Sequence, residues 1–257
     1  MKIPFLILSV TLQAAMIQAG TPVEQHPVMS TVQVLTADSL KLFGVLQKSS
    51  LDRKAPLIVM LPMMANTHIS YNTLCLALHR AAKENPAHPT LPVLLTLDMR
   101  GHGKSTQRGA ATLDAKSMGE EEFAKMPEDV RAMITQVIAD TSYHIDTSNI
   151  IVIGASIGAN SAAMLTSLLP NVKKVVMLSP GKDYHGLQPE GAVKAYKGDM
   201  LIYVSKGDSY SLESSQYLAD LNKDHCTLVT FEGDNHGTDI INKVPGAMAQ
   251  LVNWVLK

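Results

Sequence analysis

Six short, almost continuous apolar runs constrain the fold of this chain more than any other feature of its sequence. Strands that are buried on both faces of a parallel sheet have this composition. Helix-like segments lie between the runs, and this alternation predicts an α/β fold, with a mostly parallel central sheet and helices on both faces. The predicted strands are residues 57–61, 93–97, 150–153, 175–178, 200–204 and 227–231. The predicted helices are residues 71–83, 127–140, 157–169, 212–221 and 245–256, with Pro127 and Pro245 in first turns.

An antiparallel pair is expected ahead of these units, with strands at residues 31–35 and 40–46 and a turn between them. Residues 110–126 are polar and rich in small side chains, so we expect a long loop or a loose helix there. No linker-like composition divides the rest of the chain, and large α/β folds reach this length as one unit. A single domain over residues 21–257 is predicted.

Residues 1–20 have the composition of a secretory signal peptide. Lys2 precedes an apolar run that is short for a membrane span, and small residues, Ala19 and Gly20, follow it. No cysteine lies nearby to carry a lipid. We therefore expect a secreted or periplasmic protein without a stable membrane anchor. Cys75 and Cys226 could pair there, although two buried free thiols are the simpler interpretation.

The charge pattern argues against several classes of partner. The formal net charge is −1 and no basic stripe is present, so the usual electrostatic basis for binding nucleic acid is missing. Gly103-Lys104-Ser105 resembles the end of a phosphate-binding loop, but that pattern requires glycine where Asp98 stands. Nucleotide binding is not expected, and we predict no organic cofactor and no metal.

The segment Gly154-Ala155-Ser156-Ile157-Gly158 fits the G-x-S-x-G pattern in an informative context. It joins the predicted strand at 150–153 to the predicted helix at 157–169, and a serine on such a turn stands on a strained backbone. Side chains at the two glycine positions would meet the crowded strand and helix. The start of the helix adds free N–H groups and the positive end of its dipole. Ser156 is therefore the predicted nucleophile.

A serine hydroxyl needs a base to remove its proton, and a histidine held by a carboxylate serves this purpose. Asp208 follows the predicted strand at 200–204, and His236 follows the one at 227–231. Loops after parallel strands meet at one edge of the sheet, so Asp208 and His236 are the predicted acid and base. Asp183 stays open as a second candidate for the acid. The other histidines, among them His68 and His102, lack the matching position after a strand.

With the order serine, acid, histidine, the chain resembles the α/β-hydrolase superfamily over nearly all of its length after the N-terminus. The segment Asp98-Met99-Arg100-Gly101-His102-Gly103-Lys104-Ser105 is similar to a D-x-R-G-x-G-x-S turn of many members, where its role is structural. The resemblance implies an oxyanion hole of backbone N–H groups, one of them from Ile157. Many members carry His-Gly after the third strand, whereas this chain has Pro62-Met63. Because Pro62 has no N–H, Met64 is the expected second donor, with Met63 as the weaker alternative.

The resemblance also bears on the substrate. Residues 180–199 are too few to form a helical cap. In this respect the chain is similar to lidless esterases and dienelactone hydrolases. A serine nucleophile favours acyl transfer, so we expect cleavage of small carboxylic esters through an acyl-enzyme intermediate. A peptidase, thioesterase or acyltransferase with the same triad stays open, and so does a catalytically silent fold that only binds. The sequence leaves the oligomeric state open.

Overall fold

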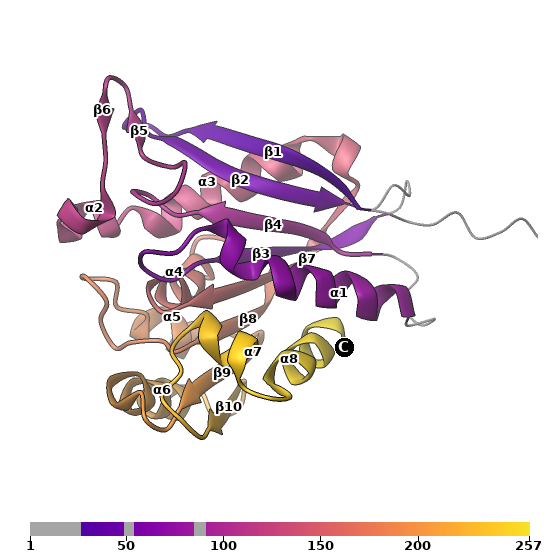
Figure 1. Cartoon of the computed structure of the whole chain (residues 1–257), viewed down its shortest axis with the longest axis vertical. Helices are drawn as coiled ribbons and strands as arrows, with labels where there is room; N and C mark the ends of the chain where they lie inside the picture. Colours follow the sequence, from indigo (N-terminus) through magenta and orange to yellow (C-terminus); the bar gives the residue numbers. More distant parts are fainter. Residues whose placement is uncertain (1–26, 49–53, 85–90) are drawn as a thin grey trace, which may run out of the picture.

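The computed structural model describes residues 27–48, 54–84 and 91–257, and one eight-stranded sheet runs through this part of the chain (Figure 1). The strand order is β1-β2-β4-β3-β7-β8-β9-β10. The opening strands are antiparallel to their neighbours, and all pairs from β4 and β3 to β9 and β10 are parallel. The predicted fold class is confirmed. The strands are β1 (Val28–Leu35), β2 (Lys41–Lys48), β3 (Ala55–Leu61), β4 (Val93–Asp98), β7 (Ile145–Ala155), β8 (Val172–Leu178), β9 (Asp199–Ser205) and β10 (Cys226–Phe231).

Helices cover both faces of this sheet (Figure 1). One core layer contains buried side chains of α3, α4, α5 and α6, and the other contains those of α1, α7 and α8. Short 3-10 turns complete the set: η1 (His68–Tyr71), η2 (Ala115–Ser117) and η3 (Thr141–Tyr143). The α-helices are α1 (Asn72–Glu84), α2 (Glu120–Phe123), α3 (Met126–Ala139), α4 (Ile157–Leu165), α5 (Glu190–Ala195), α6 (Ser209–Leu221), α7 (Thr238–Lys243) and α8 (Ala247–Leu256).

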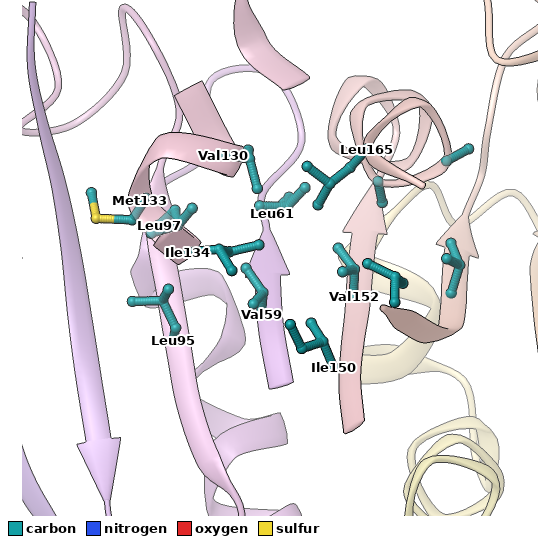
Figure 2. Packing of buried hydrophobic residues seen from close by; sticks show 14 of the residues in the cluster. Val59, Leu61, Leu95, Leu97, Val130, Met133, Ile134, Ile150, Val152 and Leu165 are labelled. Atoms are coloured by element: carbon teal, nitrogen blue, oxygen red, sulfur yellow. The ribbon is translucent and has the colours of Figure 1, made fainter. Parts of the chain in front are cut away.

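The central strands are apolar on both sides because each side meets a helix layer. In β7, Ile150 and Val152 face the layer with α3 and α4, and Ile151 and Ile153 face the other layer. Figure 2 shows the first layer, in which α3 places Ile134 above the strands that carry Val59 and Leu95. Burial of this kind is the main stabilising term of the fold. It also fixes where each strand ends, and so where the following loops lie.

The structure departs from the expected elements in a few places. Residues 110–126 form ordered short elements, namely part of the two-stranded pair β5 (Gln107–Arg108) and β6 (Ala111–Thr112), then η2 and α2. The helix expected at 245–256 begins only at Ala247, and Pro245 lies before its first turn. Gly246 precedes it with φ 81, which separates α8 from α7. Pro127 does lie in the first turn of α3.

The turn after β4 is built around buried polar groups. The Asp98 carboxylate accepts hydrogen bonds from the backbone N–H groups of His68 and Lys104, both at 2.8 Å. Ser105 Oγ donates to the Asp98 carbonyl oxygen at 2.7 Å and accepts from the Phe43 N–H at 2.8 Å. Gly101 and Gly103 take φ values of 76° and 52°, which favour glycine. The structural role expected for this segment agrees with these contacts.

Arg100 links this turn to three distant acidic residues. Its side chain is only 1% exposed and binds both carboxylate oxygens of Asp129, at 2.7 and 2.8 Å. Its Nη1 also donates to Asp38 at 2.7 Å and to Glu122 at 2.8 Å. We call this set the Arg100 cluster; it consists of Arg100, Asp38, Glu122 and Asp129, with Arg108 and Lys125 at its rim.

The Arg100 cluster is expected to make stability depend on pH in the acid range. The hydrogen bond from Arg100 holds the pKa of Asp38 far below its usual range, and the one from Arg108 lowers the pKa of Glu122 to about 2. Carboxylates with lower pKa values in the folded state stabilise it above their unfolded pKa, and this contribution is lost as the pH falls through the folded value. Burial raises the pKa of Asp129, which opposes part of the effect.

The free energy of unfolding should therefore fall between about pH 5 and pH 2. In Asp38→Asn the free energy of unfolding should depend less steeply on pH. The difference in slope should correspond to at most about one proton taken up on unfolding, and to less where solvent screens the ion pair. Urea unfolding at a series of pH values measures this slope. Glu128→Gln is the matched control, because Glu128 pairs with Arg131 on the surface. Equal slopes in wild type and Asp38→Asn would contradict the assignment.

The structure tests the predictions about the N-terminus and the cysteines only in part. The expected signal peptide at residues 1–20 lies outside the described residues, so it stays a prediction, as do the single domain over 21–257 and export. None of the helices in the described ranges has both the length and the apolar composition that a membrane span requires. Both thiols are free, but only Cys75 is fully buried, which raises its pKa to about 12. Cys226 is partly exposed.

Candidate active site

Ser156 stands on a sharp turn between β7 and α4. Its backbone has φ 52 and ψ −120, a strained conformation for a residue with a side chain. The turn requires glycine on both sides of it: a Cβ on Gly154 would lie 2.1 Å from the Gly158 carbonyl oxygen, and one on Gly158 would lie 2.5 Å from the Leu61 carbonyl oxygen. These close approaches explain the two glycines in the motif. They also bring the end of β3 against the start of α4.

Asp208 and His236 come together at the same edge of the sheet. Asp208 follows β9 and precedes α6, while His236 lies in the loop between β10 and α7. His236 Nδ1 lies 2.6 Å from Asp208 Oδ2. With a carboxylate at Nδ1, the imidazole keeps its other nitrogen, Nε2, available as a proton acceptor. The pair therefore has the geometry that an oriented general base requires.

The loop that carries His236 is tied to the turn that carries Ser156. The Gly237 N–H donates to Ser179 Oγ at 3.0 Å, and Ser179 is itself buried at the end of β8 with φ 52. A Cβ on Gly237 would lie 3.4 Å from the Cβ of Ala155, the residue before the serine. On the other side, the Gly207 N–H donates to the Gly233 carbonyl oxygen at 2.8 Å. These contacts place the His236 loop beside Ser156.

Ser156 is not bonded to His236 in this structure, since among the described residues no hydrogen bond joins the two side chains. The Tyr184 hydroxyl lies at the same strand end, 3.4 Å from the Ser179 carbonyl oxygen. Burial raises the pKa of Tyr184, and the Ser156 side chain opposes part of this rise. Catalytic hydrogen bonds are often formed only when substrate is bound, so this arrangement is compatible with a resting site. Tyr184 is the nearby residue that sequence reasoning did not assign.

The two expected oxyanion donors belong to the two segments that meet at this turn, the start of α4 and the loop after β3. Ile157 is the first residue of α4, so its N–H has no carbonyl one turn earlier to bond. Met64 lies in the turn after β3, which is closed by a 3.1 Å hydrogen bond from the Asn66 N–H to the Met63 carbonyl. In the described loops the Met64 N–H donates no backbone hydrogen bond. Both amides are therefore available, and their role stays a prediction.

The rival residues have other partners. Asp183 accepts from the Gly186 N–H and from Gln188 Nε2, each at 2.7 Å, so it braces its own loop. His68 Nδ1 lies 2.7 Å from Asp98. His102 lies between the Arg100 carbonyl oxygen at 2.9 Å and Met64 Sδ at 3.2 Å. Of the two acids weighed from the sequence, Asp208 is the one beside His236.

The described ranges hold no group of three or more histidine, cysteine and acidic side chains that could bind a metal ion. The chemistry of the site does not require one, because serine, histidine and carboxylate together carry out acyl transfer without a metal. That no cofactor takes part stays a prediction.

Comparisons with known proteins bear on the family and the fold of the chain. The sequence model of a family described as serine aminopeptidase, S33, matches residues 93–198, a segment that includes Ser156 but neither Asp208 nor His236. No curated protein matches the chain in sequence.

Several solved structures share the fold. An esterase of Pyrococcus furiosus has a TM-score of 0.67 at 16% identity, over 90% of this chain and 92% of its own. A peroxisomal α/β-hydrolase of Saccharomyces cerevisiae has a TM-score of 0.68 at 12% identity, over 90% of each chain. A predicted hydrolase of Thermoplasma acidophilum has a TM-score of 0.65 at 14% identity, over 90% of this chain and 99% of its own. At these identities the likeness establishes the fold.

Proposed function

We propose that the chain, whose fold is that of the α/β-hydrolases, is a serine hydrolase that cleaves carboxylic esters through an acyl-enzyme intermediate. The observation that carries the proposal is the 2.6 Å contact of His236 Nδ1 with Asp208 beside a serine whose backbone has φ 52. Strained backbone is kept where function requires it, and an oriented histidine is what a serine nucleophile needs.

In the proposed cycle, His236 Nε2 removes the proton of Ser156 as Oγ attacks the ester carbonyl carbon. The N–H groups of Ile157 and Met64 hold the oxyanion, and such donors are worth about 3 kcal/mol each in other hydrolases. His236 then protonates the leaving alcohol as the C–O bond breaks. A water molecule, deprotonated by His236, releases the acid and restores Ser156.

The segment after β8 is short, and this suits a small ester substrate better than a large one or one that is held under a cap domain. Only residues 179–198 separate β8 from β9, and they contain the short helix α5 and the Tyr184 loop instead of a cap domain. An aminopeptidase is the alternative that a specific observation favours, because the family whose model matches residues 93–198 is described as serine aminopeptidase. Thioesterase, acyltransferase and binding-only functions share the same residues and differ in what the site accepts.

The test is an activity-based one on the purified chain. A fluorophosphonate probe should label the peptide that contains Ser156, and p-nitrophenyl esters of short acids should be hydrolysed faster than the matched anilides and thioesters. Faster cleavage of aminoacyl anilides would favour the aminopeptidase instead. No labelling and no turnover across acyl lengths would leave a binding-only fold and overturn the proposal.

A further inference from the structure

The loop of residues 181–187 is fixed to the helix that begins after Ser156. Asn160 lies in the first turn of α4 and is fully buried. Its Nδ2 donates to the carbonyl oxygens of Gly181 at 2.9 Å and Leu187 at 2.7 Å, and its Oδ1 accepts from the Gly181 N–H at 3.1 Å. Both ends of the loop are thus held by one side chain, four residues after the serine.

The middle of the loop is held from two other sides. The Tyr210 hydroxyl, from α6, donates to the Asp183 carbonyl oxygen at 2.7 Å and accepts from the Asp183 N–H at 3.0 Å. The His185 ring stacks on Phe123 of α2, with centroids 4.4 Å apart and an interplanar angle of 19°. The loop is therefore a rigid support for the side chain that it carries at position 184.

The Tyr184 hydroxyl lies among oxygen atoms of the site. It is 3.0 Å from Ser211 Oγ and donates to the Ser179 carbonyl oxygen at 3.4 Å. The residue before Ser179, Leu178, accepts from the Ser156 N–H at 2.8 Å, so the Tyr184 hydroxyl lies at the strand end beside which Ser156 stands. Burial raises the pKa of Tyr184, so the hydroxyl keeps its proton at neutral pH. The buried Ser211 hydroxyl can donate to Tyr184, which leaves the phenol proton for another acceptor.

From this position we infer that Tyr184 is a further catalytic residue, whose hydroxyl hydrogen-bonds Ser156 Oγ as that oxygen leaves the acyl group during deacylation. The inference rests on the proposed serine hydrolase function. Tyr184 keeps its proton throughout. When the bond between the acyl carbon and Oγ breaks, its electron pair goes to Oγ, which takes a proton from His236.

This hydrogen bond affects the two halves of the cycle differently. In the free enzyme the hydroxyl oxygen of Ser156 is a good acceptor, so on this inference Tyr184 can already donate to it before acylation. In the acyl-enzyme, Oγ is the bridging oxygen of an ester and a weak acceptor, so the contact is weakened and is regained only as negative charge develops on Oγ. Only an interaction that is stronger in the transition state than before it speeds a step, so Tyr184 assists deacylation more than acylation.

The test compares Tyr184→Phe with wild type on p-nitrophenyl acetate, whose good leaving group makes acylation fast. The burst of nitrophenol gives the acylation rate, and the steady state gives deacylation. A hydrogen bond to a charged group is worth about 10- to 100-fold. We expect deacylation to slow by at least about tenfold and acylation by less than about threefold, and intact mass should show acyl-enzyme accumulating in the variant.

Tyr210→Phe is the matched control, because Tyr210 holds the same loop through Asp183 without an interaction with Ser156. Equal slowing of both steps in both variants would assign Tyr184 a structural role only and overturn the inference. An unchanged deacylation rate in Tyr184→Phe would overturn it as well. Labelling of wild-type Ser156 by a fluorophosphonate, measured in parallel, separates these outcomes from failure of the proposed function, in which no labelling occurs.

Discussion

Replacing Ser156 with alanine is expected to lower kcat for ester hydrolysis by a factor on the order of 10⁶, because the atom proposed to form the acyl-enzyme is removed. Fluorophosphonate labelling should disappear, while the melting temperature stays near that of wild type or rises. The melting temperature is not expected to fall because alanine keeps the contacts of the turn and removes only a hydroxyl, from a residue that is 7% exposed. Stopped-flow and endpoint assays with a p-nitrophenyl ester measure the loss.

Ser161→Ala is the control for this substitution. Ser161 lies on the same helix, is buried, and donates only to the Ile157 carbonyl oxygen at 3.0 Å. Its removal should change kcat by less than about threefold. If Ser156→Ala retained the wild-type rate, a different group would be the nucleophile. If Ser161→Ala were as inactive as Ser156→Ala, the loss would reflect damage to α4 and not removal of the nucleophile.

The fold was predictable because its strongest determinant is local. Six apolar runs mark strands that pack against helices on both faces, and each of them is a strand in the structure. The Arg100 cluster was not predictable, because Asp38, Glu122 and Asp129 approach Arg100 from three different segments. The break between α7 and α8 depends on Gly246 at φ 81, which an apolar pattern over residues 245–256 does not reveal.

The residues of the candidate site were likewise predictable from the sequence only in part. Their positions in loops that follow parallel strands pointed to Asp208 and His236, and the structure places these side chains 2.6 Å apart. Tyr184 carries no comparable signal in the sequence. Its hydroxyl reaches the site only because Asn160 fixes the loop and because Ser179 and His185 take positive φ values of 52° and 54°. Those are tertiary properties, and no spacing in the sequence encodes them.

Replacing Asp208 with asparagine is expected to lower kcat by about 10⁴-fold while Ser156 and His236 stay in place. An amide can donate a hydrogen bond to Nδ1, which would leave the proton of the neutral imidazole on Nε2, where it cannot accept the serine proton. The positive charge that develops on His236 also loses its counterion. Because the side-chain size is unchanged, unfolding should be little affected, and circular dichroism with a thermal melt checks this.

Asp183→Asn is the matched comparison, since both acids follow strands and both were candidates from the sequence. Asp183 bonds the Gly186 N–H and Gln188, and the asparagine oxygen can keep the first of these contacts. Its kcat should change by less than about threefold. The opposite ranking, with Asp183→Asn inactive and Asp208→Asn active, would mean that the loop of residues 181–187 moves during turnover and brings its own carboxylate to His236. The 2.6 Å contact with Asp208 would then belong to the resting protein alone.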